Sequence, residues 1–385
     1  MKTKSIILAA LSLTSLMSLS QNEDPYLWLE EVNGKKALEF VETQNKICFD
    51  RLTIRKEYQS VYDKSLEILN SNERIVYPST HAEFVYNFWQ DKDHPRGIWR
   101  RSPKTAYQSG KPAWDVLLDI DALSKKDSVL WVYKGVGGLY PKYERFLVHL
   151  SKGGGDAVIT REFDVNKKEF IEDGFYIPEA KGGASYLDEN TLVVSSDFGE
   201  NTMTTSGYPC QVKMWKRGTP LKDAKLLFEG EKNDVSCSGY VVRDGEKVFL
   251  MINRGITFYS GHQFVWNGKQ AVKLDIPEDS DVSGLLNNQL IITLKSDWTL
   301  NKDIYKQGSL VSLDFTALQR GEKKIQLLFQ PDEFSSVSGV SSTKNKILVN
   351  VLSNVKSELY TYAFESGKWV AEKIKAPDFG TIYLN

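Results

Sequence analysis

The spacing of apolar residues changes once along the chain, near residue 70. Between residues 34 and 70, apolar side chains recur three, four or seven positions apart, which is the spacing of amphipathic helices. Asn33 is placed to cap the first of these helices. Beyond this stretch, short runs rich in Val, Ile, Tyr, Phe and Trp are separated by Gly, Asn, Asp and Pro, as in strands joined by turns. The pattern predicts a short helical segment over 21–71 and an all-β domain over 72–385.

Short motifs recur within the strand-rich region at an offset of about 100 residues. The pairs are 177–179 and 276–278 (IPE), 196–198 (SDF) and 296–298 (SDW), 226–228 and 327–329 (LLF), and 238–239 and 338–339 (SG). Because another strand cluster lies between the members of each pair, the repeat unit is about 50 residues with four short strands, which is the size of a β-propeller blade.

Counting the strand clusters gives the expected number of blades. A propeller closes by bringing its last blade against its first, because an open ring leaves unpaired strand edges. We therefore predict a seven-bladed β-propeller that is truncated in its last blade. A closed six-bladed ring with a short tail is the alternative. Six clusters and the start of a seventh lie at 80–120, 143–178, 183–230, 237–277, 281–330, 336–377 and 380–384.

Residues 1–20 resemble a secretory signal peptide. Two lysines near the start precede a mostly apolar run over 6–17, and Ser18 and Ser20 occupy the −3 and −1 positions of a cleavage site. The run is shorter than the roughly 20 apolar residues of a membrane span. We expect a secreted or periplasmic protein without a membrane span; an uncleaved membrane anchor is the alternative.

Charge and composition narrow the function classes. The 49 Lys and Arg residues nearly balance the 50 Asp and Glu residues, so the chain offers no basic surface for a nucleic acid. The four histidines form no HExxH motif, and the spacing of Cys48, Cys210 and Cys237 fits no zinc site. We expect no metal, no cofactor and no nucleic-acid partner. At least one of the three thiols stays unpaired.

The sequence lacks the motifs of a hydrolase nucleophile. A nucleophile elbow needs Gly-x-Ser-x-Gly, which the 385 residues do not contain. No histidine follows His262, so the Ser–Asp–His order of the α/β hydrolases cannot be completed in the last third. Paired acids such as Asp197 and Asp297 could serve a glycoside hydrolase, although their equivalent places in the repeat favour a role in turns. We assign no catalytic residue.

The segment 96–102 (RGIWRRS) is the strongest local candidate for binding. In a strand, Arg100 lies on one face, and Trp99 and Arg101 lie on the other. Arginine beside tryptophan can hold a carboxylate or an aromatic group by bidentate hydrogen bonds and stacking. We predict that Trp99, Arg100 and Arg101 bind substrate; salt bridges between domains are the alternative.

Several motifs resemble those of the prolyl oligopeptidase family of serine peptidases. The opening 24–31 (DPYLWLEE), followed by 40–42 (FVE) and 44–45 (QN), is the most specific of them. Further motifs are similar to a bacterial branch of the family. They are 88–91 (FWQD), 96–101 (RGIWRR), 114–119 (WDVLLD), 155–158 (GDAV), 161–164 (REFD), 204–209 (TTSGYP) and 296–298 (SDW).

The resemblance implies one part of a two-part enzyme. In this family a split α/β-hydrolase domain carries the catalytic serine, aspartate and histidine, and a seven-bladed propeller caps it. Only short, flexible peptides enter, and they are cleaved after proline. The helices at 34–70 would be the N-terminal piece of the hydrolase domain. The family often sets an aromatic residue of the second blade near the substrate, and Glu162 aligns with that position.

We therefore expect the N-terminal and propeller portion of an exported prolyl-oligopeptidase-like serine endopeptidase. It would gate the access of short proline-containing peptides to a catalytic domain absent from this chain, which a companion chain could carry. Alone it would be inactive, because binding without a nucleophile and a base does not lower the barrier to acyl transfer. The alternative is a stand-alone propeller that binds peptides or proteins.

Overall fold

The computed structural model describes residues 24–73, 76–376 and 380–384, and the chain divides into two compact units, 1–74 and 75–385. The predicted signal peptide over 1–20 lies outside the described residues. No helix in the described part of the chain is long and apolar enough to cross a membrane.

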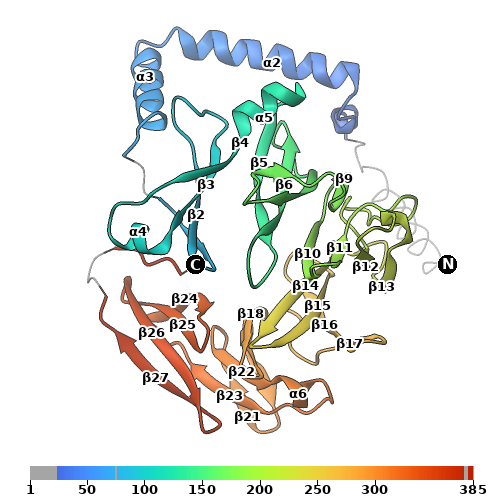
Figure 1. Ribbon diagram of the computed structural model, residues 1–385, viewed down its shortest axis with the longest axis vertical. Coiled ribbons are helices and arrows are strands. Elements are labelled where there is room, and N and C mark those ends of the chain that lie inside the picture. Colours follow the sequence, from blue (N-terminus) through green and yellow to red (C-terminus); the bar gives the residue numbers. More distant parts are fainter. Residues whose placement is uncertain (1–23, 74–75, 377–379, 385) are drawn as a thin grey trace, which may run out of the picture. The chain divides into compact units, whose positions relative to one another are not determined.

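The first unit is helical, as Figure 1 shows in blue. Its elements are η1 (Leu27–Glu30), α2 (Lys35–Thr53) and α3 (Tyr58–Leu69). Gly34, and not the expected Asn33, occupies the N-cap of α2, and no side chain caps that end. Most apolar side chains of both helices are exposed. Among them are Leu38, Val41, Ile47, Leu52, Val61, Leu66 and Leu69.

Among the described residues, the second unit contains six antiparallel sheets of four or five strands that follow one another in chain order, and a separate two-stranded sheet, β20–β21 (Figure 1). Within each sheet, neighbouring strands are also neighbours in sequence, apart from a hairpin that is inserted in the fifth sheet and from β9, which pairs with β7. The first sheet is β1 (Ser79–His81), β2 (Phe84–Trp89), β3 (Ile98–Pro103) and β4 (Asp115–Asp119). The second is β5 (Trp131–Gly138), β6 (Arg145–Lys152), β7 (Val158–Asp164), β8 (Glu169–Phe170) and β9 (Tyr176–Ala180). The third is β10 (Gly183–Asp188), β11 (Thr191–Ser195), β12 (Gln211–Lys216) and β13 (Lys225–Glu229).

The remaining sheets repeat this meander, and their limits agree with the strand clusters predicted from sequence. The fourth sheet is β14 (Ser236–Asp244), β15 (Lys247–Gly255), β16 (Gly261–Trp266) and β17 (Ala271–Lys273). The fifth is β18 (Asp281–Leu286), β19 (Gln289–Thr293), β22 (Leu310–Asp314) and β23 (Ile325–Phe329), with the hairpin β20 (Trp298–Leu300) and β21 (Asp303–Tyr305). The sixth is β24 (Ser335–Ser342), β25 (Lys346–Ser353), β26 (Lys356–Glu365) and β27 (Lys368–Ile374).

Short helices fill some of the connections in this unit. They are α4 (Lys104–Gln108), α5 (Ile120–Asp127), η2 (Leu221–Asp223) and α6 (Phe315–Leu318). Asp119 and Asp314 cap α5 and α6, because each carboxylate accepts a hydrogen bond from a backbone N–H in the first turn. The unit is therefore all-β with few helices, as the apolar pattern predicts.

Five buried apolar clusters join consecutive sheets. The central strands can serve two clusters at once because successive side chains point to opposite faces. Representative members are Trp99 and Phe146 (first and second sheets), Ile177 and Leu192 (second and third), Val193 and Ile252 (third and fourth), Met251 and Ile292 (fourth and fifth), and Ile291 and Val349 (fifth and sixth). Within the described ranges, no such cluster joins the sixth sheet to the first.

The segment 380–384, expected to begin a seventh blade, forms no strand in the structure. It lies along the sixth sheet, where Asn350 Nδ2 donates a hydrogen bond to the carbonyl oxygen of Ile382 at 2.7 Å. A strand needs a ladder of backbone hydrogen bonds, and here one side chain supplies the contact. The seventh blade stays a prediction.

Gly239 permits the close approach of the third and fourth sheets. A Cβ atom added to Gly239 would lie 2.4 Å from Val193 Cγ1 and 2.5 Å from Val212 Cγ1. We expect Gly239→Ala to lower the free energy of unfolding by about 1–3 kcal/mol through overpacking, as measured by urea denaturation. Gly183→Ala is the matched control, because its added Cβ would meet no atom within 4 Å. Equal stability of the two variants would contradict this account.

Candidate functional site

Trp99, one of the predicted binding residues, belongs to the hydrophobic core. Its side chain is 1% exposed, stacks on Tyr86 and meets Phe146 edge to face. This face of β3 packs against the second sheet, so the indole is covered by protein and offers no surface to a ligand. The structure corrects the prediction for Trp99.

Arg100 lies on the opposite face of the first sheet. Its guanidinium is held between the rings of Trp89 and Trp114, at 4.5 and 4.4 Å from their centroids. Its Nε donates a hydrogen bond to Asn87 Oδ1 at 3.0 Å. Burial lowers the pKa of Arg100, and the negative charge of Asp91 opposes that shift. The two terminal nitrogens have no hydrogen-bond partner among the described residues, which leaves a fork that can bind a carboxylate.

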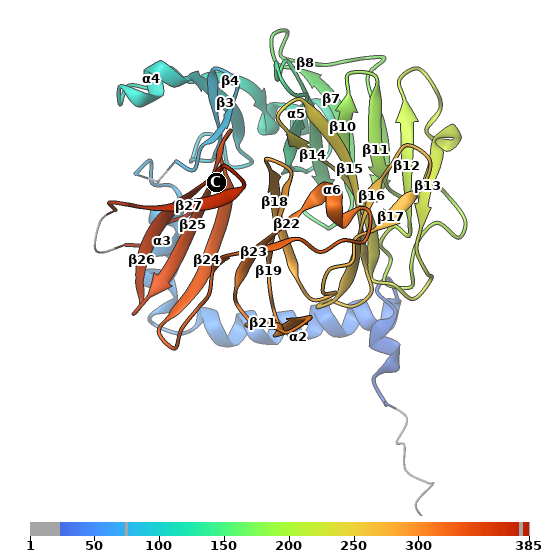
Figure 2. The same cartoon turned by 90° about the horizontal axis from the view of Figure 1, so that it is seen from below.

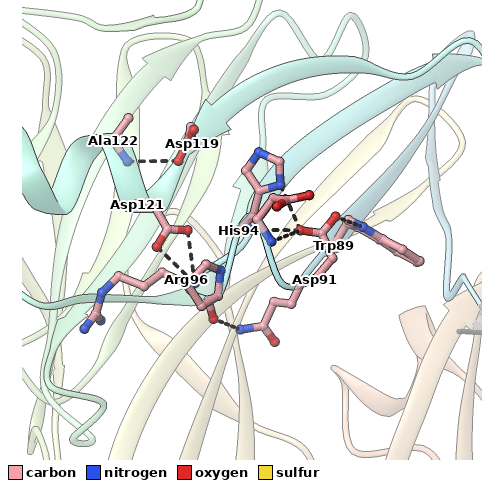
Figure 3. Close-up of polar contacts among 10 residues, drawn as sticks. Trp89, Asp91, His94, Arg96, Asp119, Asp121 and Ala122 are labelled. Carbon is pink, nitrogen blue, oxygen red and sulfur yellow. Dashed lines mark hydrogen bonds and ion pairs between the residues drawn. The ribbon is translucent and has the colours of Figure 1, made fainter. Parts of the chain in front are cut away.

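The turn before β3 fixes the orientation of Trp89 (Figure 3). Asp91 accepts hydrogen bonds from the indole Nε1 of Trp89 at 2.9 Å and from the backbone N–H of His94 at 2.8 Å. Burial opposes ionisation of this carboxyl, but these bonds outweigh it and lower the pKa of Asp91 to about 2. In the same view, the backbone N–H of Arg96 donates to Asp121. The turn is therefore held on both sides.

Arg101 shares the face of Trp99 and faces the second sheet. Its guanidinium lies 4.3 Å from the ring centroid of Phe84, and one terminal nitrogen donates to Asn166 at 3.4 Å. Its Nε is 3.8 Å from a carboxylate oxygen of Asp115. Arg100 and Arg101 thus point to opposite faces, as alternation predicts, and the three residues form no single site. Substrate binding by Arg100 and Arg101 stays a prediction.

A groove of about 880 Å³ lies where β14 and β18 begin and β15 ends. Three neutral polar side chains form a hydrogen-bonded chain in its lining. Tyr240 Oη donates to Gln263 Oε1 at 3.1 Å, and Gln263 Nε2 donates to Asn253 Oδ1 at 3.0 Å. Burial raises the pKa of Tyr240 to about 12, so this phenol stays protonated at neutral pH. The lining therefore offers uncharged hydrogen-bonding groups.

One wall of the groove is the loop that joins β15 to β16. Its ends are tied together, because the N–H of Ile256 donates to the carbonyl oxygen of Ser260 at 3.0 Å, and the hydroxyls of Thr257 and Ser260 lie 2.8 Å apart. The loop presents Phe258 and Tyr259, each 88% exposed. Two adjacent aromatic rings are thus held in solvent by a hydrogen-bonded loop.

The groove carries more negative than positive charge. Its lining includes the carboxylates of Glu278, Asp279 and Asp281 and one ammonium group, that of Lys295. Lys295 pairs with Asp281 at 2.6 Å. Glu278 accepts a hydrogen bond from the ring of His262 at 2.5 Å, which lowers the pKa of this carboxyl. Asp279 has no ion pair or hydrogen bond to any side chain that the structure describes.

A second cavity of about 440 Å³ continues this surface between β10 and β14. It shares Ser238 with the first groove and is lined by Gly182, Tyr208 and Pro209. Tyr208 and Pro209 belong to the motif 204–209. That loop is anchored by Thr204, whose hydroxyl donates to the carbonyl oxygen of Tyr208 at 3.1 Å. Figures 1 and 2 show β10, β14 and β18 side by side, so the two cavities span three consecutive sheets.

Glu162 is buried between the second and third sheets. Its carboxylate accepts two hydrogen bonds from Arg217, both at 2.7 Å, one from Tyr186 Oη at 2.9 Å and one from the N–H of Phe175 at 3.0 Å. Burial opposes its ionisation, but these four bonds outweigh it and lower the pKa of Glu162. The Glu162 side chain is therefore an internal link between the second and third sheets.

The acids considered for glycoside hydrolysis hold turns. Asp197 accepts a hydrogen bond from the N–H of Gly199 at 2.8 Å. Asp297 accepts hydrogen bonds from the N–H of Gln307 and from Lys306 Nζ, both at 2.8 Å. Their contacts support the turn role. Among the described residues, no group of three or more His, Cys, Asp or Glu is placed to hold a metal ion.

The comparisons with known proteins agree with this architecture. Residues 17–384 match the family model of the prolyl oligopeptidase N-terminal β-propeller domain. The chain is 37% identical to an uncharacterized peptidase of Sinorhizobium fredii over 94% of its own length, and 28% identical to one of Rickettsia prowazekii over 89%. A solved structure of a post-proline cleaving enzyme from Rickettsia typhi matches with a TM-score of 0.85 and 28% identity over 92% of this chain.

The chain spans about half the length of these relatives. It covers 51% and 50% of the two uncharacterized peptidases, and 54% of the Rickettsia typhi enzyme. Oligopeptidase B from Leishmania major, at 14% identity and a TM-score of 0.67, shares the fold over 49% of its chain. The similarity therefore concerns one half of longer proteins.

We expect the Glu162–Arg217 pair to make stability depend on pH. Because the folded state lowers the pKa of Glu162 from its usual 4.5, the pair stabilises the fold above that pH and loses this effect as pH falls through the lowered value. Glu162→Gln should lower the free energy of unfolding at pH 7 by about 3 kcal/mol, since it leaves Arg217 unpaired. Between pH 7 and pH 4, the free energy of unfolding of this variant should also fall less than that of the unsubstituted chain. Urea denaturation at pH 7 and pH 4 measures both effects.

The matched control is Glu169→Gln, at an exposed position of the same sheet. Arg217→Gln should destabilise in the same direction, and the double variant should lose less than the sum of the two single losses. Additive losses, or a Glu162→Gln variant as stable as the control, would contradict the assignment of this pair.

Proposed function

Because the chain belongs to the prolyl oligopeptidase N-terminal β-propeller family, we propose that it is the propeller portion of an exported serine endopeptidase. In this proposal the propeller gates the access of short proline-containing peptides to a catalytic domain that lies outside the 385 residues. The relatives support a peptidase role, since two are described as peptidases and one as a post-proline cleaving enzyme. A companion chain could carry the catalytic domain.

The observation that carries this proposal is the exposed apolar surface of α2 and α3. Helices in water expose polar faces and bury apolar ones, and contiguous exposed apolar surface marks a binding face. Leu38, Val41 and Leu52 of α2 and Val61 and Leu66 of α3 are all exposed. We infer that these helices form part of a hydrolase domain, whose remaining elements cover them.

A seventh sheet is part of the same proposal. The free face of the first sheet carries the exposed Val116 and Arg100, whose two terminal nitrogens have no hydrogen-bond partner among the described residues. The free face of the sixth sheet carries Leu352 and Val370, which are also exposed. A further sheet between them would cover both faces and close the ring. On this arrangement a carboxylate of that sheet, as well as a peptide, would be a partner for Arg100.

The alternative function is a stand-alone propeller that binds peptides or proteins. The groove beside Phe258 and Tyr259 favours it, because concave surfaces with a few placed polar groups are typical of ligand sites. The two functions share peptide binding and differ in whether a catalytic domain docks on α2 and α3.

The proposal predicts that the purified chain does not hydrolyse a proline-ester chromophore. Co-expression with the C-terminal half of the Sinorhizobium fredii relative should give a complex that does, because that half supplies the groups that attack the ester. Leu38→Asp with Val41→Asp should reduce the yield of complex more than tenfold, since burying two aliphatic side chains contributes about 3–6 kcal/mol. Pull-down and release of the chromophore measure these effects.

Gln44→Asp, an exposed polar position on α2, is the matched control and should leave the yield unchanged. Hydrolysis by the chain alone would contradict the proposal. A complex that forms equally well with the double variant would contradict the role of the helices.

Export predicts a shortened N-terminus. Expressed with its own first residues in a bacterial host, the chain should be found in the periplasm with residue 21 first, because the apolar run ends in a signal-peptidase pattern. N-terminal sequencing of the periplasmic fraction tests this, and an intact Met1 on membrane-bound protein would instead support the anchor.

A further inference from the structure

We propose that the groove at β14, β15 and β18 binds a positively charged group of a peptide, with Asp279 as its counter-ion and Phe258 and Tyr259 as an aromatic wall. The charged group is a peptide α-ammonium or a lysine or arginine side chain. This inference rests on the proposed function, because it names a feature of the peptides that the propeller admits.

The charge of the groove selects the sign of the ligand. The carboxylates of Glu278 and Asp281 are each matched by a cationic or hydrogen-bonding partner, His262 and Lys295. Asp279 lines the same groove without a partner among the described residues. A half-buried, unpaired carboxylate is stabilised by a cation that enters the groove, and it repels an anion.

The aromatic wall gives the site its second recognition element. Phe258 and Tyr259 are each 88% exposed although both have large apolar rings, and hydrogen bonds among Ile256, Thr257 and Ser260 tie the two ends of their loop together. The faces of such rings attract ammonium and guanidinium groups, and the attraction grows when water is excluded. Preorganised rings also bind without the entropy cost of ordering a loop.

The lining of the groove suits the backbone of an extended peptide. Asn253 and Gln263 are neutral amides, and each has both donor and acceptor atoms. The volume of about 880 Å³ lies within the range of ligand sites, roughly 300–1,000 Å³. The second cavity, reached through Ser238, extends the surface for residues further along the peptide.

The test is binding of labelled tetrapeptides to the purified chain, followed by fluorescence anisotropy. Four peptides carry the dye at the C-terminus: Lys-Ala-Pro-Ala, its N-acetylated form, norleucine-Ala-Pro-Ala, and the N-acetylated form of that peptide. We expect the uncharged acetyl-norleucine peptide to bind weakest, and affinity for the charged peptides to fall as salt is raised. The N-acetylated lysine peptide carries only the side-chain charge, and the norleucine peptide with a free N-terminus carries only the α-ammonium. The tighter binder of these two shows which charged group occupies the groove.

Two variants address the proposed contacts. Asp279→Asn should weaken binding of the charged peptides about three- to fivefold and leave the uncharged peptide unaffected. The double variant Phe258→Ala with Tyr259→Ala should weaken binding of the charged peptides about tenfold. The controls are Asp173→Asn and Phe334→Ala, an exposed acid and an exposed aromatic residue outside the groove. Thermal melting checks that all variants are folded.

Equal affinity for all four peptides, unchanged affinity in Asp279→Asn, or no binding at millimolar concentration would each overturn the inference. These measurements use the chain alone, without a catalytic half. If the peptides do not bind as expected but the co-expressed complex hydrolyses the chromophore, only the proposed role of the groove is rejected. Charge-dependent binding without complex formation would retain the groove and reject the proposed peptidase arrangement.

Discussion

The second unit depends on one constraint, which is that each position of a strand covered by a neighbouring sheet needs an apolar side chain, or a polar one with its hydrogen-bond partners. In β11, Leu192 and Val194 point toward the second sheet and Val193, between them, points toward the fourth. All three are fully buried. The Glu162–Arg217 pair obeys the same constraint. Burying a carboxylate between two sheets costs on the order of several kcal/mol of folding free energy unless a cation and hydrogen bonds accompany it. Each of the second to fifth sheets is thus stabilised by two neighbouring sheets.

Much of this architecture could be predicted from sequence, because helical and strand periodicities are local. The cluster predicted at 237–277 corresponds to strands that run from Ser236 to Lys273. The prediction of a strand at 380–384 is wrong, because alternation of apolar and polar residues indicates only that a segment is able to pair with another strand. Whether it does pair depends on a distant partner, and here the side chain of Asn350 takes that place.

The candidate site was less predictable. Alternation correctly separates Arg100 from Trp99 and Arg101, but it does not indicate which face of β3 the second sheet covers. The sequence therefore predicts binding by Trp99, whereas the structure places this residue in the core. The groove is assembled from strands and loops that are distant in sequence. Its local signal was weak: two adjacent aromatic residues, Phe258 and Tyr259, between turn residues.

The absence of a buried apolar cluster between the sixth and first sheets, within the described ranges, makes this unit a linear array of sheets. In such an array the terminal members lose contacts to one neighbour when they open, whereas an inner member loses contacts to two. Protection of backbone amides against hydrogen exchange is then graded, lowest in β1–β4 and β24–β27 and highest in the third and fourth sheets. The unit opens first at its two end sheets, and the three interfaces among the second to fifth sheets stay intact while it does.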